Sequence, residues 1–457
     1  MTTYYRYALA MLLACLVGQS SLVAAQSKAV SAVVGVVETS LASQDSRPVQ
    51  ACVSSEPGTH PGLTVANGIV VGADLIDEIG GYAGAAGTTG GHGGQLLTVT
   101  TLEDYGSHEP AIPGSLRNHL DTAQRNKKPA WIVFDRKLPA HARLVLKRTL
   151  RVPSNVTVDG SCVDITLEAP YESKTILTYI SDGVQNVIIS QLAMRKTGYV
   201  PESYPEAAST IVVNGRFDRV AIIHNDLSKC GHSCIDITVS PNWPLPERSR
   251  ISILYNFIHD NDKVMLFGTY NCPQVGGLNT CSEHDSEMNR QTHPSMYLTV
   301  EGNVFARTGQ RHPRIFGRVT AHVYNNLIAF KPLAYADGRL ASSYGIFVSN
   351  GARALIESNL LLPLTEKLRQ PLAVWTTGTP GAIRMPTDTE GFIRLEQNLV
   401  FRRAIARENK PLEVPPPDYG YEVLPMQALQ PEDAVKCLFN RAGRGGSQTW
   451  HRELCGR

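Results

Sequence analysis

An asparagine that recurs just after the apolar core of successive short strands is the feature that most constrains the fold of this chain. β-Branched segments are spaced along its 457 residues, from WIVFD at 131–135 to FIRLEQNLVFR at 392–402. A repeat at intervals of about twenty to fifty residues is typical of a solenoid that carries insertions on one face. Six segments have the asparagine at the same strand-relative position: Asn225, Asn256, Asn303, Asn326, Asn359 and Asn398.

The recurring asparagine has a physical role in such a solenoid. Asparagine tolerates the left-handed backbone conformation of sharp turns, and stacked amide side chains can hydrogen-bond from one repeat to the next. A β-sandwich with frequent turns is the alternative, but sandwiches do not usually repeat asparagine at one position of the strand. We therefore predict an all-β fold, a single-stranded right-handed parallel β-helix over residues 61–405.

The first 25 residues have the organisation of a secretory signal peptide. Arg6 supplies the positive charge, residues 8–17 form the apolar run, and Val23-Ala24-Ala25 is a small-residue cleavage site. This run is too short to span a bilayer, and no later stretch qualifies. We expect an exported protein, secreted or periplasmic, whose residues 26–60 form a partly disordered N-terminal extension.

The cysteines fit an oxidising compartment. Removing the signal peptide discards Cys15 and leaves eight of the nine cysteines, an even number. A zinc site is the rival interpretation, but the spacing lacks two CxxC pairs. We expect Cys272 to pair with Cys281 and Cys437 with Cys455, whereas Cys230 and Cys234 pair with each other or elsewhere.

The asparagine rhythm stops after Ile405. KPLEVPPPDYGYEVLP reads as an extended, proline-rich strap. PEDAVKCLFNRAGRGG then predicts a short helix, with Pro431 in its first turn and glycines at its end. We expect residues 406–457 to form a strap and a capping helix that covers the open end of the solenoid.

The net charge of +2 gives no general attraction for nucleic acid, so any affinity for an anion must be local. Two basic positions provide it. Lys263 follows the strand segment ILYNFIHD, and Arg311 follows LTVEGNVFA. If these segments stack as successive rungs, both side chains project onto one face and build a cationic cleft. Taken singly, Lys263 is better explained as a solvated rim charge and RHPR as a surface turn, but taken together on adjacent predicted rungs they favour a functional site.

Five motifs occur in order along the chain: AGTTGGHGG at 86–94, PSNVTVDG at 153–160, HNDLSKCGHSCID at 224–236, DKVMLFG at 262–268, and RHPR at 311–314 before HVYNN. In this order they resemble the pectate lyase family of secreted parallel β-helix polysaccharide lyases. The order of the motifs matches that family from about Gly80 to Asn326. The spacing of the repeated strand and asparagine continues the resemblance to about Asn398.

The resemblance implies β-elimination on a polyuronate such as pectate or polygalacturonate. The proton α to the uronate carboxylate is removed, and the glycosidic oxygen leaves from the adjacent carbon. Because an ionised carboxylate poorly stabilises the developing charge, the site must neutralise it with cations. On the family pattern Arg311 is the catalytic base, Lys263 holds the substrate carboxylate, and Arg314 is a second substrate contact.

The same resemblance implies calcium, with Asp236 as a metal ligand. The sequence departs from the pattern here, because His232 replaces an acidic residue and Ser209 and Thr210 replace a further aspartate. Calcium prefers several hard oxygen ligands. The site could therefore use calcium bound to the substrate, recruit acids of the insertion loop (Glu283, Asp285, Glu287), or work without metal. His232 either meets the substrate or belongs to a locally rebuilt turn beside the cysteines.

Other classes of function are less well supported. No GxSxG elbow points to a serine hydrolase, and no pair of aspartates clusters at the cleft segment as glycoside hydrolysis would require. The alternative to the lyase is a non-catalytic carbohydrate-binding β-helix protein derived from a lyase scaffold. In either case we expect a monomer whose partner is an acidic polysaccharide rather than nucleic acid or a membrane.

Overall fold

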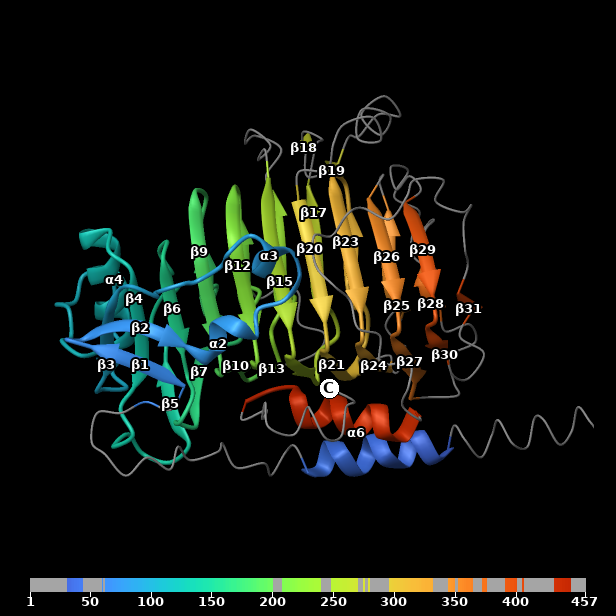
Figure 1. The fold of residues 1–457 in the computed structure, drawn as a ribbon, viewed down its shortest axis with the longest axis horizontal. Coiled ribbons are helices and arrows are strands. Elements are labelled where there is room, and N and C mark those ends of the chain that lie inside the picture. The colour runs from blue at the N-terminus through green and yellow to red at the C-terminus, as the bar shows by residue number, and fades with distance from the viewer. Residues whose placement is uncertain are drawn as a thin grey trace, which may run out of the picture.

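The computed structural model describes residues 31–43, 60, 62–199, 208–239, 248–269, 274–275, 278–279, 296–331, 344–349, 352–364, 372–375, 391–400, 405–406 and 431–444. Its strands wind into one solenoid of three long sheets, which stack from the N-terminal to the C-terminal end of the molecule (Figure 1). The predicted parallel β-helix is confirmed. The predicted signal peptide and proline-rich strap lie outside the described residues.

The twelve-stranded sheet begins with antiparallel pairs and continues as a parallel stack. Its strands are β1 (Leu63–Ala66), β2 (Ile69–Ala73), β3 (Gln95–Val99), β4 (Ala130–Phe134), β6 (Val156–Asp159), β9 (Val184–Ser190), β12 (Phe217–Ile223), β15 (Ser249–Leu254), β20 (Met296–Glu301), β23 (Val319–Tyr324), β26 (Arg353–Glu357) and β29 (Phe392–Glu396).

The other two long sheets are parallel throughout, and each rung passes from the twelve-stranded to the nine-stranded and then to the eight-stranded sheet. The nine-stranded sheet holds β5 (Ala142–Val145), β7 (Ile165–Pro170), β10 (Ala193–Thr197), β13 (Asp226–Ser228), β16 (Phe257–His259), β21 (Val304–Thr308), β24 (Leu327–Phe330), β27 (Leu360–Pro363) and β30 (Leu399–Val400). The eight-stranded sheet holds β8 (Thr178–Ile180), β11 (Ile211–Asn214), β14 (Ile235–Val239), β17 (Met265–Thr269), β22 (Arg314–Phe316), β25 (Tyr344–Ser349), β28 (Leu372–Trp375) and β31 (Ile405–Ala406). A separate hairpin pairs β18 (Gln274–Val275) with β19 (Leu278–Asn279).

The six asparagines form the predicted ladder inside the solenoid. The Nδ2 of Asn256 donates to the Oδ1 of Asn303 at 3.0 Å, and Asn303 donates to Asn326 at the same distance. Equivalent bonds join Asn225 to Asn256, Asn326 to Asn359 and Asn359 to Asn398. Each rung is thus tied to the next by a buried amide, which satisfies a polar group that burial would otherwise penalise.

The left-handed residue of each corner is the one before the ladder asparagine, not the asparagine itself. His224, Tyr255, Asn325, Ser358 and Gln397 have φ between 52° and 57°. This corner divides each segment predicted as one strand into two strands of different sheets, as β15 and β16 show. The sequence pattern thus located the rungs but merged two of their three strands.

A helix closes the N-terminal end of the solenoid. In α4 (Leu116–Asn126), Leu116, Leu120 and Ala123 pack into the main hydrophobic core, and the Ser115 side chain caps the helix by accepting from the amide of Asn118. Short helices α2 (Asp74–Asp77) and α3 (Gly81–Ala85) lie over the twelve-stranded sheet (Figure 1). These helices were not predicted from the sequence.

The C-terminal helix is confirmed, but it does not cover the open end. Helix α6 (Pro431–Arg441) lies along the side of the solenoid, next to the helix of residues 31–43 (Figure 1). Leu438 and Phe439 pack with Leu327 and Leu360 of the nine-stranded sheet. The reason is that the outer face of this sheet is apolar on its later rungs, so the helix buries that apolar surface.

One disulfide lies fully within the described residues and joins Cys230 to Cys234. Cys162 and Cys437 are disulfide-bonded too. The predicted pairs of Cys272 with Cys281 and of Cys437 with Cys455 involve residues outside the described part. Where the chain is described, no helix has the length and apolar character needed to cross a membrane.

Candidate active site

The outer face of the eight-stranded sheet carries the candidate site. Ile235, Met265 and Ile315 point into the hydrophobic core. Because side chains alternate along a strand, their neighbours face outward. The pairing of β14, β17, β22 and β25 therefore aligns four residues on the outer face: Asp236, Leu266, Arg314 and Phe347.

Lys263 and Arg311 enter this face from adjacent rungs. Lys263 forms an isolated parallel bridge with Gln310, the residue before Arg311. The backbone amide of Met265 donates to the carbonyl of Arg311 at 2.9 Å. The two basic residues therefore lie side by side at the start of neighbouring strands, as their similar sequence contexts predict.

The RHPR turn is anchored by its histidine. The backbone of Arg311 is left-handed, with φ of 66°, and a cis peptide bond joins His312 to Pro313. The buried His312 ring contacts the Tyr344 carbonyl at 2.9 Å through Nδ1 and the Thr308 hydroxyl at 2.8 Å through Nε2. Burial lowers the pKa of His312 to about 4, so the ring is neutral at pH 7 and serves as a rigid support.

Arg311 lacks the ion-pair partner that several other arginines of the described chain have. Arg117, Arg216 and Arg307 form ion pairs with aspartates at 2.6–2.7 Å. Within the described residues no ion pair involves Arg311, and its Nε and Nη1 atoms are buried without a hydrogen-bond partner. Unsatisfied buried donors cost about 1–3 kcal/mol each, so a chain keeps them only where something else requires the position.

The charges of the site converge on Asp262, which is only 8% exposed. Burial raises the pKa of Asp262, although Lys263, Arg311 and His232 each lower it through their charges and Gln310 through a hydrogen bond. Burial likewise raises the pKa of Tyr344, against the lowering effect of Arg311 and Arg314. Arg311 thus acts on both side chains, while Lys263 and His232 act on Asp262 and Arg314 acts on Tyr344.

Arg314 projects between aromatic rings of the outer face. Its guanidinium carbon lies 5.2 Å from the ring centroid of Phe347 and 5.8 Å from that of Phe316. Such cation–π contacts hold a guanidinium in place on the outer face.

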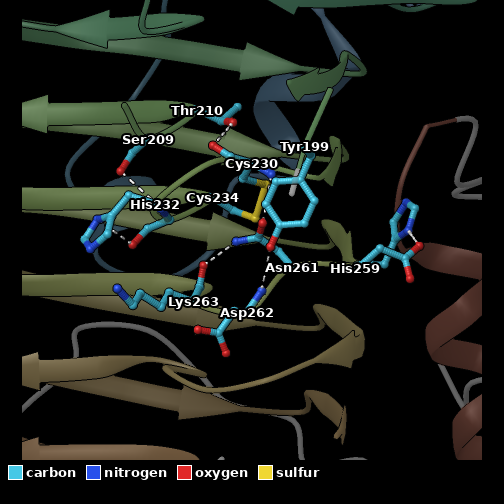
Figure 2. The surroundings of a disulfide bond; sticks show 12 residues. Tyr199, Ser209, Thr210, Cys230, His232, Cys234, His259, Asn261, Asp262 and Lys263 are labelled. Carbon is cyan, nitrogen blue, oxygen red and sulfur yellow. Dashed lines mark hydrogen bonds and ion pairs between the residues drawn. A yellow bond between two sulfur atoms is a disulfide. The ribbon is translucent and has the colours of Figure 1, made fainter. Parts of the chain in front are cut away.

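His232, Ser209 and Asp236 form a second cluster on this face, one rung from Lys263 (Figure 2). The Ser209 hydroxyl donates a short hydrogen bond to Oδ2 of Asp236, and Nδ1 of His232 lies 3.4 Å from the same oxygen. Burial alone would raise the pKa of Asp236, but His232, Ser209 and Arg311 outweigh it and hold the pKa below its usual range.

The donors at this position do not fit calcium. Calcium takes about 6–8 oxygen ligands, whereas Asp236 is the single carboxylate of this cluster and its Oδ2 is already hydrogen-bonded. No group of three or more His, Cys, Asp or Glu residues in the described chain could hold a metal ion. The insertion-loop acids Glu283, Asp285 and Glu287 lie outside that part.

The structure brings together all five residues predicted for the site: Arg311, Lys263, Arg314, His232 and Asp236. It adds Asp262 and Tyr344, which sequence reasoning missed. Asp262 directly precedes Lys263, and this adjacency was an available signal. Tyr344 follows a long insertion, so nothing in the sequence ties it to the RHPR turn.

Two further histidines are structural. Nε2 of His224 lies 2.8 Å from a carboxylate oxygen of Glu78, and the ring stacks on Tyr255. Nε2 of His322 lies 2.6 Å from Glu357. Both lie in strands or corners of the twelve-stranded sheet, away from the candidate site.

Comparisons with known proteins agree with this architecture. No protein-family model matches the chain. Pectate lyase 1 of Juniperus virginiana is 29% identical over 250 residues, which cover 52% of this chain and 58% of that protein. A pectate trisaccharide-lyase of Bacillus licheniformis is 25% identical over 299 residues, which cover 65% and 69% of the two chains. The chain thus spans little more than half the length of the juniper relative.

Among solved structures, the crystal structure of jun a 1, the major allergen from cedar pollen, matches 81% of this chain and 94% of its own, with a TM-score of 0.55 at 22% identity. The fold and the site together define a parallel β-helix protein with a cationic outer face. Within that class the chain is similar to pectate lyases in sequence and in fold, which supports the resemblance that its motifs indicated.

Proposed function

We propose that this protein is an exported polysaccharide lyase that cleaves an acidic polyuronate by β-elimination. One observation carries the proposal. Arg311 has no ion-pair partner in the described chain, and it lies beside Lys263 of the adjacent rung. The relatives named as pectate lyases support the reaction class.

In the proposed reaction Arg311 removes the proton α to the uronate carboxylate. The electron pair forms a double bond to the adjacent carbon, and the glycosidic oxygen leaves that carbon and takes a proton from water. Lys263 and Arg314 neutralise the carboxylate while its negative charge grows in the transition state. Guanidinium groups hold their protons strongly, so this step requires Arg311 to enter it as the neutral guanidine.

The direct test is the ultraviolet absorbance of the unsaturated product on polygalacturonate, pectin and alginate. We expect absorbance to rise with the parent protein and to stay flat with Arg311→Ala. Arg219→Ala is the matched control, because Arg219 also has a left-handed backbone but lies in β12 of the twelve-stranded sheet. Glycan binding without any product would instead favour the carbohydrate-binding protein.

Export is part of the proposal and has its own test. The predicted signal peptide and the disulfides at Cys162, Cys230 and Cys437 support an oxidising destination. Expression of the full chain followed by mass spectrometry of the exported protein should give a mature N-terminus at Gln26. Retention of the unprocessed chain inside the cell would contradict it.

A further inference from the structure

The position at which the family resemblance implies calcium is occupied by side chains that hydrogen-bond one another through Oδ2 of Asp236, while the buried Oδ1 of Asp236 has no hydrogen-bond partner in the described chain. Asp236 is the residue expected to bind the ion, and its Oδ2 accepts from Ser209 and lies 3.4 Å from His232. The amide of Ser233 also donates to the Ser209 hydroxyl at 3.2 Å. A calcium ion would have to break these bonds and replace them with too few oxygens.

A covalent clamp holds the histidine in this place. His232 is the central residue of the five-residue loop closed by the Cys230–Cys234 disulfide, and both cysteines are fully buried. The Cys230 carbonyl accepts from the Thr210 hydroxyl at 2.9 Å. The loop therefore has little freedom to withdraw His232 and open a metal cavity.

The same loop is tied to the lysine of the site. The Oδ1 of the buried Asn261 accepts from the Cys230 amide at 2.9 Å, and its Nδ2 donates to the Lys263 carbonyl at 2.6 Å. Figure 2 shows the His232 ring and the Lys263 side chain extending to the same side of the sheet. His232 and Asp236 keep 17% and 15% of their side-chain surface exposed, so this cluster borders the face that would meet substrate.

The nearest second carboxylate does not complete a metal site. Asp262 accepts from Nε2 of Gln310 at 3.1 Å, and its Oδ1 lies against Gly309, where even a Cβ atom would come within 2.3 Å. Its surroundings already contain Lys263, Arg311 and His232. An additional divalent cation would therefore add to the positive charges of Lys263 and Arg311 rather than relieve a negative cluster.

We propose that the Ser209–Asp236–His232 cluster, clamped by the Cys230–Cys234 loop, takes the place of the calcium ion, so that this chain binds its polyuronate without a divalent cation. The inference rests on the proposed function for the identity of the ligand. It assigns the stabilisation of the Asp236 carboxylate to the side chains of Ser209 and His232, which contact it directly.

The first experiment measures binding of trigalacturonate to the full-length protein by calorimetry, in EGTA and in calcium chloride. We expect the two dissociation constants to agree within about twofold, and calcium alone to leave the melting temperature unchanged. Binding that disappears in EGTA, or a melting temperature that rises with calcium, would overturn the proposal.

The second experiment restores acids at the two positions of the cluster. Ser209→Asp with His232→Asp surrounds Asp236 with carboxylates, which repel one another unless a cation binds. We expect this variant to be less stable in EGTA and to gain melting temperature with calcium. Ser107→Asp with His108→Asp is the matched control, because both residues are exposed and neither belongs to the eight-stranded sheet that carries the cluster.

The outcomes separate this inference from the proposed reaction. A double variant that remains insensitive to calcium would refute the assignment of the cluster to the metal position; if it does not fold, His232→Asp alone provides the same test. Parent protein that binds trigalacturonate in EGTA without forming unsaturated product would refute the lyase and leave the inference intact. Product formation that requires calcium would support the lyase and refute the inference.

Discussion

Lys263 pairs with Gln310 across two neighbouring rungs, and this pairing places Lys263 beside the residue that directly precedes Arg311. Two cations that are distant in the sequence are thereby held on one face by backbone geometry rather than by a flexible loop. Rigid elements of this kind preserve the spacing of a site better than loops do. The predictions below test this arrangement and the scaffold that maintains it.

Replacement of Arg311 should abolish elimination and leave the fold intact. Arg311→Ala removes the proposed base, and we expect initial rates of product formation to fall by about a thousandfold. Because Arg311 has no ion pair in the described chain, the variant should unfold at the temperature of the parent. A variant that retains more than about a tenth of the parent rate would show that another group removes the proton.

Replacement of Lys263 should weaken the reaction in a way that depends on substrate charge. Lys263→Gln removes a cation that contacts the carboxylate, so kcat/KM on polygalacturonate should fall by about 10–100-fold. On fully methyl-esterified pectin the ratio of parent to variant should shrink towards one, since no carboxylate charge remains to be neutralised. Lys174→Gln, at an exposed position, is the control. An equal loss on both substrates would contradict a role in carboxylate binding.

The asparagine ladder should contribute most to stability at its centre. Asn303 accepts from the amide of Asn256 at 2.9 Å and donates to the Ile253 carbonyl and to Asn326. Asn303→Ala leaves these buried partners unsatisfied, and we expect a loss of about 2–4 kcal/mol in the free energy of unfolding. Asn398→Ala, at the last rung, should cost less because Asn398 is partly exposed. Denaturant titrations that rank the two variants equally would argue against a cooperative ladder.

His259 should make the fold sensitive to mildly alkaline pH. Burial disfavours its protonated form, but Asp226 and Asp260 outweigh burial and raise its pKa from 6.5 to about 9. A raised pKa stabilises the fold fully below the unfolded value of 6.5, and this contribution is lost as the pH rises through 9. The loss should be on the order of 3 kcal/mol.

Unfolding free energies of the parent and of His259→Gln, measured from pH 6 to pH 10, would check this expectation. The parent curve should decline across that window, and the variant curve should be lower at pH 6 and flatter. His108→Gln, at an exposed position, should follow the parent. Parallel curves for the parent and His259→Gln would contradict the raised pKa.

The sequence was most informative where one physical requirement repeats on every rung. Each corner needs a buried amide that hydrogen-bonds to the amide of the next corner. The recurrence of Asn225, Asn256 and Asn303 at one strand position therefore predicted the solenoid. The third strand of each rung was harder to recognise, because strands of the eight-stranded sheet such as β17 and β22 follow no fixed spacing. Helix α6 was located correctly in the sequence but not in space, since its partner face forms only when distant strands stack.

The sequence by itself determined the parallel β-helix, the order of its rungs and the basic residues Lys263 and Arg311, because each of these depends on local patterns of a few residues. The tertiary structure decided which side chains surround them. Insertions of unequal length separate Ser209, Asp236 and Tyr344, and only the hydrogen-bonded register of β11, β14, β17, β22 and β25 brings them to one sheet. That register, at about 4.8 Å per rung, converts residues remote in the chain into one site.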